Sequence, residues 1–549
     1  MLLVTRLVAC FLIASSALVV RAQDTGTFAT GTAQAFLETD QLQVALYNTG
    51  TLFFGGSTTS GDGYLVPKHT GNSPVFAASL WLGGKVNGGL RMTAARYGGY
   101  DFRPGPLEDA AQPPTDCTTY DRIYTVSRQD VARYLATGRV TDDLRDWPVE
   151  AGAPVVDGDG VAGNYNLEGG DQPEILGDVN AFWVMNDVGR LRDTTRTRSW
   201  VEPLGVEVRA LAFAFDPVGR NALSTPTFYR YEIGNRSAQS IDSLYVSIWA
   251  DAEIGDAGDD YAGTDTLRSM VYMYNESNED SAYGVAPPAW GVQLLKGPVI
   301  GDDSLGMTSA GRHYGSGPTG QGDPNGAQQF YNYMQGLWAD GTPVTATGTG
   351  YGTDGPVTRF IFPGDPVTET FWSEVNTDGS GTDGFQGDRR IVLSSGPGRL
   401  GPGESVELVY AMPFGQGADH LDSITALRAQ ADVLRRVFEN GGFAFRPVVA
   451  GEYQGNEVLL PERQLEVSRV NPNPSSGAAS AVLALPIEAR VRAAIYDALG
   501  RQLEIVVDGE LAGGETVLTL PDGLAPGTYL LRVEVAPGGE ETLTFTVAR

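Results

Sequence analysis

The chain has 549 residues, of which 42% are hydrophobic and 19% charged, a composition typical of a folded globular protein and not of a disordered one. Its 71 glycines and 32 prolines are too frequent for a mainly helical protein and are usual in loop-rich β proteins. The formal net charge of −29 argues against nucleic acid as a partner, because an acidic surface repels the phosphate backbone.

The first 22 residues have the features of a secretory signal peptide. Arg6 supplies a positive charge, residues 7–20 are apolar, and Val20-Arg21-Ala22 resembles an A-x-A cleavage site. No later stretch reaches the roughly 20 apolar residues that a membrane-spanning helix needs. We therefore expect residues 1–22 to be removed after export through the Sec translocase. The mature chain is then expected to have no transmembrane helix and to be secreted or held on the outer cell surface.

Cysteine usage limits how an exported chain can be stabilised. Removal of residues 1–22 takes away Cys10, so Cys117 is the only cysteine left and no internal disulfide is possible. An exported protein without disulfides must be stabilised by a large core, by bound cations, or by both.

Residues 23–461 are expected to form a β-rich body, as one domain or two subdomains. Residues 206–215 carry apolar side chains on both faces with a period of two, which predicts a strand buried inside a β-sandwich. Residues 229–233 and 244–248, on either side of turn residues 235–237, predict a long hairpin.

Two further strands and two helices are expected in the body. The strands are at residues 75–82 and 391–395. A capping box at Ser127 and Asp130 predicts a helix over 131–136 that stops at Gly138. Ser423 is expected to cap a helix over 424–440, and this helix has one apolar face that should pack on a sheet, formed by Ile424, Leu427, Ala431, Leu434 and Phe438.

Residues 462–470 are expected to be a linker, and residues 471–549 a separate small domain. Strand signals at 491–495, 517–520, 529–535 and 543–547 are separated by turns rich in Gly, Pro and Asp. About 80 residues with this pattern predict an immunoglobulin-like antiparallel β-sandwich. The expected fold class is therefore mainly β, with a large sandwich-like body, a few helices and a C-terminal sandwich.

The terminal segment resembles the type A C-terminal sorting domain of proteins exported by the type IX secretion system of certain gram-negative bacteria. The resemblance lies in four motifs in order, formed by Asn471, Pro472, Asn473 and Pro474; by Tyr496, Asp497, Gly500 and Arg501; by Pro526, Gly527 and Tyr529; and by a final strand that ends at Arg549. It implies passage through the periplasm and recognition by the outer-membrane translocon. Segments 177–187, 261–265 and 387–397 resemble parts of large uncharacterised secreted proteins that carry this domain.

Two acidic loops have partial ligand patterns for calcium. Asn376, Asp378 and Ser380 occupy positions 1, 3 and 5 of a calcium loop, Gly381 follows at position 6, and Asp383 or Asp388 would complete the ligand set. The second loop contains Asp157, Asp159 and Asp171. Solvated turns would account for both patterns equally well, because Asp and Gly favour turns. The expected role of calcium is to stabilise the loops.

Catalytic motifs are scarce in this sequence. Its three histidines form no short metal-binding pair, no G-x-S-x-G motif occurs, and the catalytic residues stay unknown. We therefore expect a non-catalytic secreted or surface protein with a structural, adhesive or ligand-binding role. Two alternatives stay open: a secreted hydrolase that uses a carboxylate pair on polysaccharide, and a carbohydrate-binding module that stacks glycan on Trp338, Tyr351 or Trp372.

Overall fold

The structure is a computed structural model, and its chain divides into two compact units, residues 1–452 and 453–549. The description covers residues 31–54, 63–97, 101–107, 118–188, 201–217, 221–301, 303–315, 317, 320–453, 466–467, 470, 472–476, 479–485, 489–497, 501–511, 514–536 and 539–548. The expected signal peptide, Cys10 and Cys117 lie outside these residues.

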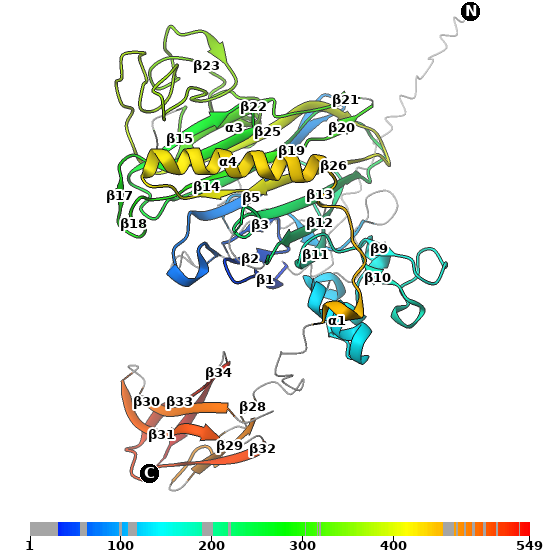
Figure 1. Cartoon of the computed structure of the whole chain (residues 1–549), viewed down its shortest axis with the longest axis vertical. Coiled ribbons are helices and arrows are strands. Elements are labelled where there is room, and N and C mark those ends of the chain that lie inside the picture. The colour runs from blue at the N-terminus through cyan, green and yellow to red at the C-terminus, as the bar shows by residue number, and fades with distance from the viewer. Residues whose placement is uncertain are drawn as a thin grey trace, which may run out of the picture. The chain divides into compact units, whose positions relative to one another are not determined.

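The first unit is built on two large antiparallel sheets (Figure 1). In the described part of the chain, one sheet has nine strands, in the order β1-β2-β3-β5-β14-β25-β22 with β4 beside β2 and β6 beside β5. Its strands are β1 (Gln34–Glu38), β2 (Gln43–Tyr47), β3 (Thr51–Leu52), β4 (Tyr64–Leu65), β5 (Val75–Val86), β6 (Gly89–Ala94), β14 (Ile241–Ala252), β22 (Ser309–Tyr314) and β25 (Arg389–Leu400).

The second sheet of this unit has ten strands among the described residues, in the order β15-β16-β19-β26-β13-β12-β11-β7 with β27 beside β19 and β8 beside β11. They are β7 (Arg103–Pro104), β8 (Tyr124–Ser127), β11 (Val179–Asn186), β12 (Val206–Ala214), β13 (Thr227–Asn235), β15 (Asp260–Asp265), β16 (Met270–Asn275), β19 (Ala289–Lys296), β26 (Ser405–Met412) and β27 (Phe414–Gly415).

The first unit also contains short strand pairs and helices outside the two large sheets. The paired short strands are β9 (Val155–Val156) with β10 (Gln172–Pro173), β17 (Glu279–Asp280) with β18 (Gly284–Val285), β20 (Val299–Ile300) with β21 (Asp303–Ser304), and β23 (Val344–Thr345) with β24 (Val357–Thr358). The α-helices are α1 (Arg128–Thr137), α2 (Asp142–Arg145), α3 (Ala327–Met334) and α4 (His420–Glu439). The 3-10 helices are η1 (Lys68–Thr70), η3 (Thr118–Tyr120), η4 (Val149–Ala151), η5 (Leu167–Gly169) and η6 (Ala450–Glu452).

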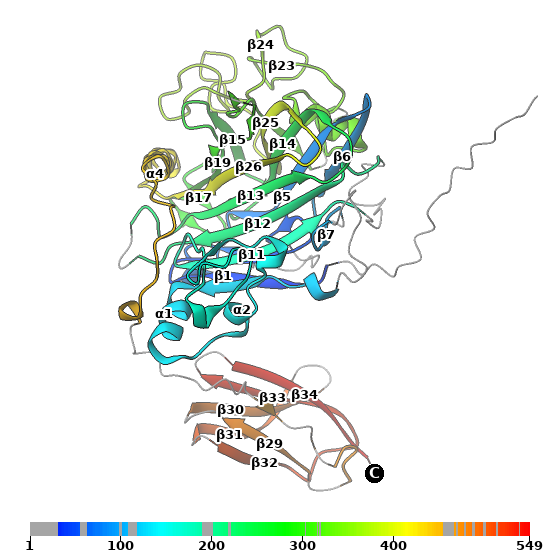
Figure 2. The same ribbon diagram turned by 90° about the vertical axis from the view of Figure 1, so that its right-hand side faces the viewer.

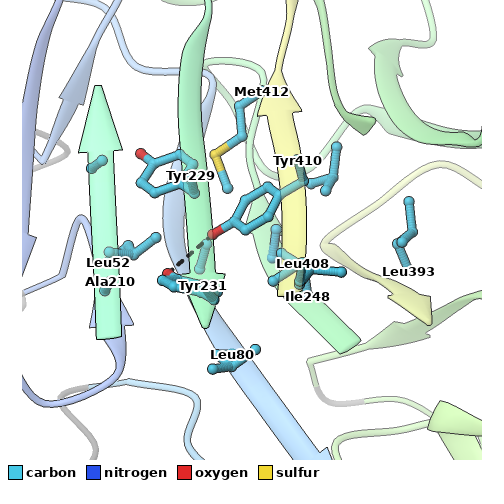
Figure 3. Packing of buried hydrophobic residues seen from close by; sticks show 14 of the residues in the cluster. Leu52, Leu80, Ala210, Tyr229, Tyr231, Ile248, Leu393, Leu408, Tyr410 and Met412 are labelled. Atoms are coloured by element: carbon cyan, nitrogen blue, oxygen red, sulfur yellow. Dashed lines mark hydrogen bonds between the residues drawn. The ribbon is translucent and has the colours of Figure 1, made fainter. Parts of the chain in front are cut away.

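The main core lies between the two sheets, and Figure 3 shows a part of it. Leu80, Ile248 and Leu393 come from the nine-stranded sheet, whereas Tyr231 and Tyr410 come from the ten-stranded one, and all five are buried. The expected fold class is confirmed: the protein is mainly β, with a sandwich-like body. Since both sheets bury their inner faces and helices cover parts of the outer ones, many strands are apolar on both sides.

The predicted hairpin is wrong. β13 pairs with β12 and β26 in the ten-stranded sheet, whereas β14 pairs with β5 and β25 in the nine-stranded sheet. Residues 236–240 therefore connect the two sheets and do not form a hairpin turn. The buried Asn235 stabilises this crossing, because its side-chain amide donates to the carbonyl oxygens of Gln239 (2.8 Å) and Leu400 (3.0 Å). The connection is too short in sequence for periodicity to tell a sheet crossing from a hairpin.

The capping box of α1 is confirmed, and the start of α4 needs a correction. Ser127 accepts a hydrogen bond from the backbone of Asp130, and Gly138 ends α1 in the left-handed conformation. The N-cap of α4 is Asp419, four residues before the predicted cap, and the helix begins at His420. Ser423 lies inside the helix and donates to the carbonyl oxygens of Pro287 (2.8 Å) and Asp419 (3.0 Å).

The apolar face of α4 packs as predicted, on the outer face of the ten-stranded sheet. Ile424, Leu427 and Ala431 are buried in one cluster with Tyr272 and Tyr274 of β16. Figure 2 views this helix end-on at the side of the body. The helix α3, which the sequence analysis did not predict, lies on the outer face of the nine-stranded sheet, where Phe330 packs against Trp81.

The second unit has its own core between two small antiparallel sheets. One sheet contains β28 (Glu466–Val467), β29 (Ala479–Leu485) and β32 (Gly514–Leu520), and the other contains β31 (Gln502–Leu511), β30 (Ala489–Asp497), β33 (Gly527–Ala536) and β34 (Gly539–Val547). Buried members of both sheets form one cluster, among them Leu483, Leu518, Ile495, Leu531 and Phe545. The predicted strands therefore form an antiparallel sandwich.

The main core offers a matched pair of tyrosines for a test. The Tyr229 hydroxyl is buried and has no hydrogen-bond partner, whereas the Tyr231 hydroxyl accepts a hydrogen bond from Tyr410 at 3.1 Å (Figure 3). We expect Tyr229→Phe to leave the free energy of unfolding unchanged or to raise it by up to about 1 kcal/mol, and Tyr231→Phe to lower it by about 1 kcal/mol. Thermal melting of both variants measures the difference. Equal destabilisation by the two changes would contradict the difference in hydrogen bonding between the two hydroxyl groups.

Candidate metal sites

The first candidate site is the loop between β9 and β10, which folds around the side chain of Asp171. This carboxylate is 1% exposed and accepts hydrogen bonds from the backbone N–H groups of Gly158 (2.9 Å), Asp159 (3.3 Å) and Asn166 (2.7 Å). A Cβ atom at Gly158 would collide with the carbonyl of Gly170, so glycine lets the two ends of the loop approach closely. The loop conformation thus depends on one buried carboxylate.

This loop brings three predicted ligands together. One carboxylate oxygen from each of Asp157, Asp159 and Asp171 lies within 4.8 Å of the others. The side-chain amides of Asn164 and Asn166 each donate to Asp159 Oδ2 at 3.0 Å, and hydrogen bonds of this kind lower the pKa of Asp159. The Oδ1 atom of Asn164 is buried and accepts no hydrogen bond. Carboxylate and amide oxygens are the ligands that hard cations prefer, so the donor set fits a divalent cation.

The second predicted loop has a different arrangement. Asp378 Oδ1 accepts from the N–H and the hydroxyl of Ser380 (both 2.8 Å), and Oδ2 accepts from the hydroxyl of Thr382 (2.5 Å). These bonds, the one from Thr382 first, hold the pKa of Asp378 well below its usual range. Asn376 Oδ1 accepts from the N–H of Gly381 at 3.0 Å. The side-chain oxygens of Asp378 and Asn376 therefore stabilise the turn of the loop. The exposed Asp383 belongs to neither of the two acidic clusters found among the described residues.

A second acidic cluster joins Asp388, a predicted ligand of the Asp378 loop, to two acids from a distant part of the chain. Asp251 at the end of β14 and Glu253 just after it meet Asp388, which precedes β25, with oxygens within 4.8 Å of one another. β14 and β25 are neighbours, with Ala250 opposite Ile391, so sheet pairing brings the three carboxylates together. Asp388 lies more than 130 positions from the other two residues, so no local sequence pattern links the three carboxylates.

Tyr97 and Arg390 complete this second cluster. The Tyr97 hydroxyl donates to Asp251 Oδ2 at 2.5 Å, and Arg390 Nη2 donates to the same oxygen at 3.2 Å. Arg390 also forms ion pairs with Asp251 Oδ1 (3.0 Å) and with Asp388. Burial raises the pKa of Asp251 to about 8 even though Arg390 opposes that shift. The cluster can therefore hold a proton or a divalent cation. No signal in the sequence pointed to Tyr97.

The pKa of Glu253 leads to a testable pH dependence. Burial, and then the charge of Asp388, raise this pKa from 4.5 to about 7. The resulting stabilisation is complete below the unfolded-state pKa and is lost as the pH rises through the folded-state pKa. With a chelator present, we expect the free energy of unfolding to fall between about pH 5 and about pH 8, by on the order of 1 kcal/mol per unit of pKa difference.

Glu253→Gln should reduce that pH dependence without abolishing it, because the raised pKa of Asp251 acts over the same range, and melting temperatures measure the change. Glu439→Gln is the control, because Glu439 is exposed at the end of α4. A slope that stays the same in Glu253→Gln would contradict the role of Glu253.

The aromatic residues considered for glycan stacking have structural positions. Trp338 is 1% exposed and Trp372 is 3% exposed, and their indole N–H groups donate to the carbonyl oxygens of Gly350 (2.7 Å) and Gly348 (2.9 Å). Tyr351 packs edge-on against Trp338. Buried tryptophans cannot stack on a glycan, so these side chains pack the long loop between α3 and β25 (residues 335–388) against the cluster that contains Trp81 and Trp249.

His313 has no free ring nitrogen for chemistry. It is fully buried, its Nε2 accepts from Trp249 Nε1 at 3.0 Å, and its Nδ1 lies 3.3 Å from Asp323 Oδ1. Desolvation lowers its pKa, so the ring is held neutral as part of the packing.

The motifs of the terminal unit form local contacts where they are described. Asp497 Oδ1 accepts from the N–H of Arg501 (3.0 Å), and Oδ2 accepts from its guanidinium (2.7 Å). The Tyr529 hydroxyl donates to the carbonyl of Ala525 at 2.6 Å, next to Pro526 and Gly527. Asn473 Oδ1 accepts from the N–H of Thr546 in β34 at 2.9 Å. Asn471 and Gly500 lie outside the described residues.

No protein-family model and no curated protein matches the chain. A polysaccharide lyase among the solved structures is 11% identical over 67% of this chain and 39% of the lyase, with a TM-score of 0.21, so the chain spans about two fifths of that protein. The sensor domain of an anti-sigma factor from Pseudobacteroides cellulosolvens is 11% identical over 16% of this chain and 97% of that domain, with a TM-score of 0.13. Both TM-scores are too low to support an inference about this chain.

None of the described helices combines the length and the apolar character that crossing a membrane requires.

Proposed function

We propose that this chain is a secreted or cell-surface protein with a non-catalytic structural, adhesive or ligand-binding role, and that calcium stabilises the loop between β9 and β10. The observation that carries the proposal is the convergence of Asp157, Asp159 and Asp171 within 4.8 Å. Three carboxylates at this distance repel one another, and a bound divalent cation would cancel that repulsion only in the folded state. A glycan or surface polysaccharide is the ligand class we propose for the body.

Calcium is expected to raise the melting temperature of the full chain relative to the protein with a chelator. A cation at a concentration of 100 times its Kd adds about 2.7 kcal/mol to the free energy of unfolding. Magnesium at the same concentration is the control for general screening, because it demands a stricter octahedral geometry. A melting temperature that does not differ between calcium and chelator would contradict the proposal.

We also propose export by the type IX route, with the terminal unit as the sorting signal. The support is the order of motifs in the sequence together with a separate core for residues 453–549. Deletion of residues 471–549 should leave the protein in the periplasm, as fractionation would detect. Arg490→Gln, an exposed change outside the motifs, serves as the control. Normal surface delivery of the truncated chain would contradict this proposal.

A carboxylate-dependent polysaccharide hydrolase is the second candidate. The observation that favours it is Glu253, which is partly exposed, has a pKa raised to about 7, and lies beside Asp388. An acid with this pKa can donate a proton near neutral pH. Turnover on a glycan array that Glu253→Gln abolishes and Glu439→Gln preserves would favour the hydrolase. Absence of turnover by the wild type would contradict it.

A further inference from the structure

Two arginines and one glutamate are buried together where the long loop meets the body. Arg312 lies on β22 and Arg389 on β25, and because Arg312 pairs with Ile391 and Tyr314 with Arg389, both arginines are on the same face of neighbouring strands. Glu374 comes from the loop before β25. The side chains of Arg312, Arg389 and Glu374 are 1%, 0% and 1% exposed.

Glu374 accepts hydrogen bonds from Arg389 but not from Arg312. Arg389 donates to both of its carboxylate oxygens, at 3.0 and 2.7 Å, and the backbone N–H of Ala262 donates at 2.6 Å. The Nε atom of Arg312 lies 3.7 Å from Glu374 Oε1, which is an ion-pair distance but too long for a hydrogen bond. Arg312 therefore has a carboxylate nearby but no carboxylate that accepts its N–H groups.

Several guanidinium N–H groups have no acceptor. Nε and Nη1 of Arg312 and Nη1 of Arg389 are buried without a hydrogen-bond partner, and Arg312 Nη2 is 3.4 Å from the carbonyl of Thr349. The rings of Tyr314 and Phe362 lie 4.7 and 5.2 Å from the centre of the Arg312 guanidinium. The aromatic faces stabilise the cation and the side chain of Tyr314 interacts with both guanidinium groups, but Nε and Nη1 of Arg312 and Nη1 of Arg389 still lack an acceptor.

The charges of this cluster do not balance. Two guanidinium groups and one carboxylate leave one net positive charge, and arginine does not give up its proton in a protein. Asp260 is also fully buried but forms no ion pair with either arginine, and burial raises its pKa well above the usual value although the charge of Arg389 opposes that shift. An uncompensated buried charge costs several kcal/mol, and a bound counter-ion would remove that cost.

We propose that a monovalent inorganic anion of the chloride class binds between the unpartnered N–H edges of Arg312 and Arg389. Both side chains are almost completely enclosed, which excludes a larger organic anion. The anion supplies the missing negative charge and an acceptor for the free N–H groups, and it thereby fixes the long loop on the sheet edge. This site is independent of the proposed calcium loop.

The test compares melting temperatures of the full chain in sodium chloride and in sodium glutamate at equal ionic strength and constant calcium. We expect chloride to raise the wild-type melting temperature saturably, on the order of a few degrees. Arg312→Met, which keeps much of the side-chain volume and removes the excess charge, should lose this response. Arg399→Met, at an arginine 68% exposed, should keep it.

An equal chloride response in the wild type and Arg312→Met, or no response in the wild type, would overturn the proposal. Crystals of the wild type grown in bromide give a readout that does not depend on the variant folding. An anomalous peak between the two guanidinium groups would support the site, and bromide found elsewhere only, or nowhere, would overturn it.

Discussion

Replacing Asp171 by asparagine is expected to lower the free energy of unfolding by about 2–3 kcal/mol. Asparagine keeps the shape of the side chain, but one acceptor oxygen becomes an NH2 group that faces a backbone N–H donor. The donors of Gly158 and Asn166 approach at 2.9 and 2.7 Å from opposite sides of the carboxylate, so either orientation of the amide loses a hydrogen bond. The variant should also lose the stabilisation by calcium.

Melting of Asp171→Asn with calcium and with a chelator measures both effects. Glu168→Gln is the matched control, because it removes one charge from an exposed position on the same loop. It should change the free energy of unfolding by less than about 0.5 kcal/mol. A calcium response that survives intact in Asp171→Asn would show that the loop does not hold the cation.

Replacing Glu374 by glutamine is expected to have the largest effect of any single change considered, a loss of about 3–5 kcal/mol. The variant leaves Arg312 and Arg389 buried without a carboxylate, and both are almost fully enclosed. Adding Arg312→Met to Glu374→Gln removes one of these charges, so the double variant should recover part of the lost stability.

Asp242→Asn is the control for that experiment. Asp242 pairs with Arg399 at 3.2 Å, but the two side chains are 58% and 68% exposed, so its loss should cost less than about 1 kcal/mol. Thermal melting in glutamate buffer compares the variants without added halide. A loss in Glu374→Gln no greater than in Asp242→Asn would show that burial of this ion pair is not important for stability.

Local patterns in the sequence were sufficient where neighbours in the chain decide the conformation. The capping box of α1 needs only residues 127–130, and the strand β12 follows from a period of two. The sequence also predicted the apolar face of α4, but it did not predict the residue at which this helix begins. Asp419 and Ser423 are both good caps, and the choice between them depends on the contact of Ser423 with Pro287, far away in the sequence.

The two candidate metal sites also differ in whether local sequence or strand pairing brings their residues together. The cluster of Asp157, Asp159 and Asp171 lies within one loop of 15 residues, so its composition pointed to it. Asp388 was predicted to complete the loop of Asp378, but it lies with Asp251 and Glu253. The pairing of β14 with β25 decides this placement, and strand pairing between distant segments leaves no local signal.

By itself, the amino-acid sequence determined that the protein is mainly β and that its C-terminal segment forms a sandwich, because side-chain periodicity and turn residues act over a few positions. Only the tertiary structure decided that β13 and β14 belong to opposite sheets. It alone also brought Arg312, Glu374 and Arg389 together in a buried cluster with an excess of positive charge. Those outcomes depend on which distant strands pair and on the burial that follows, and no short segment contains that information.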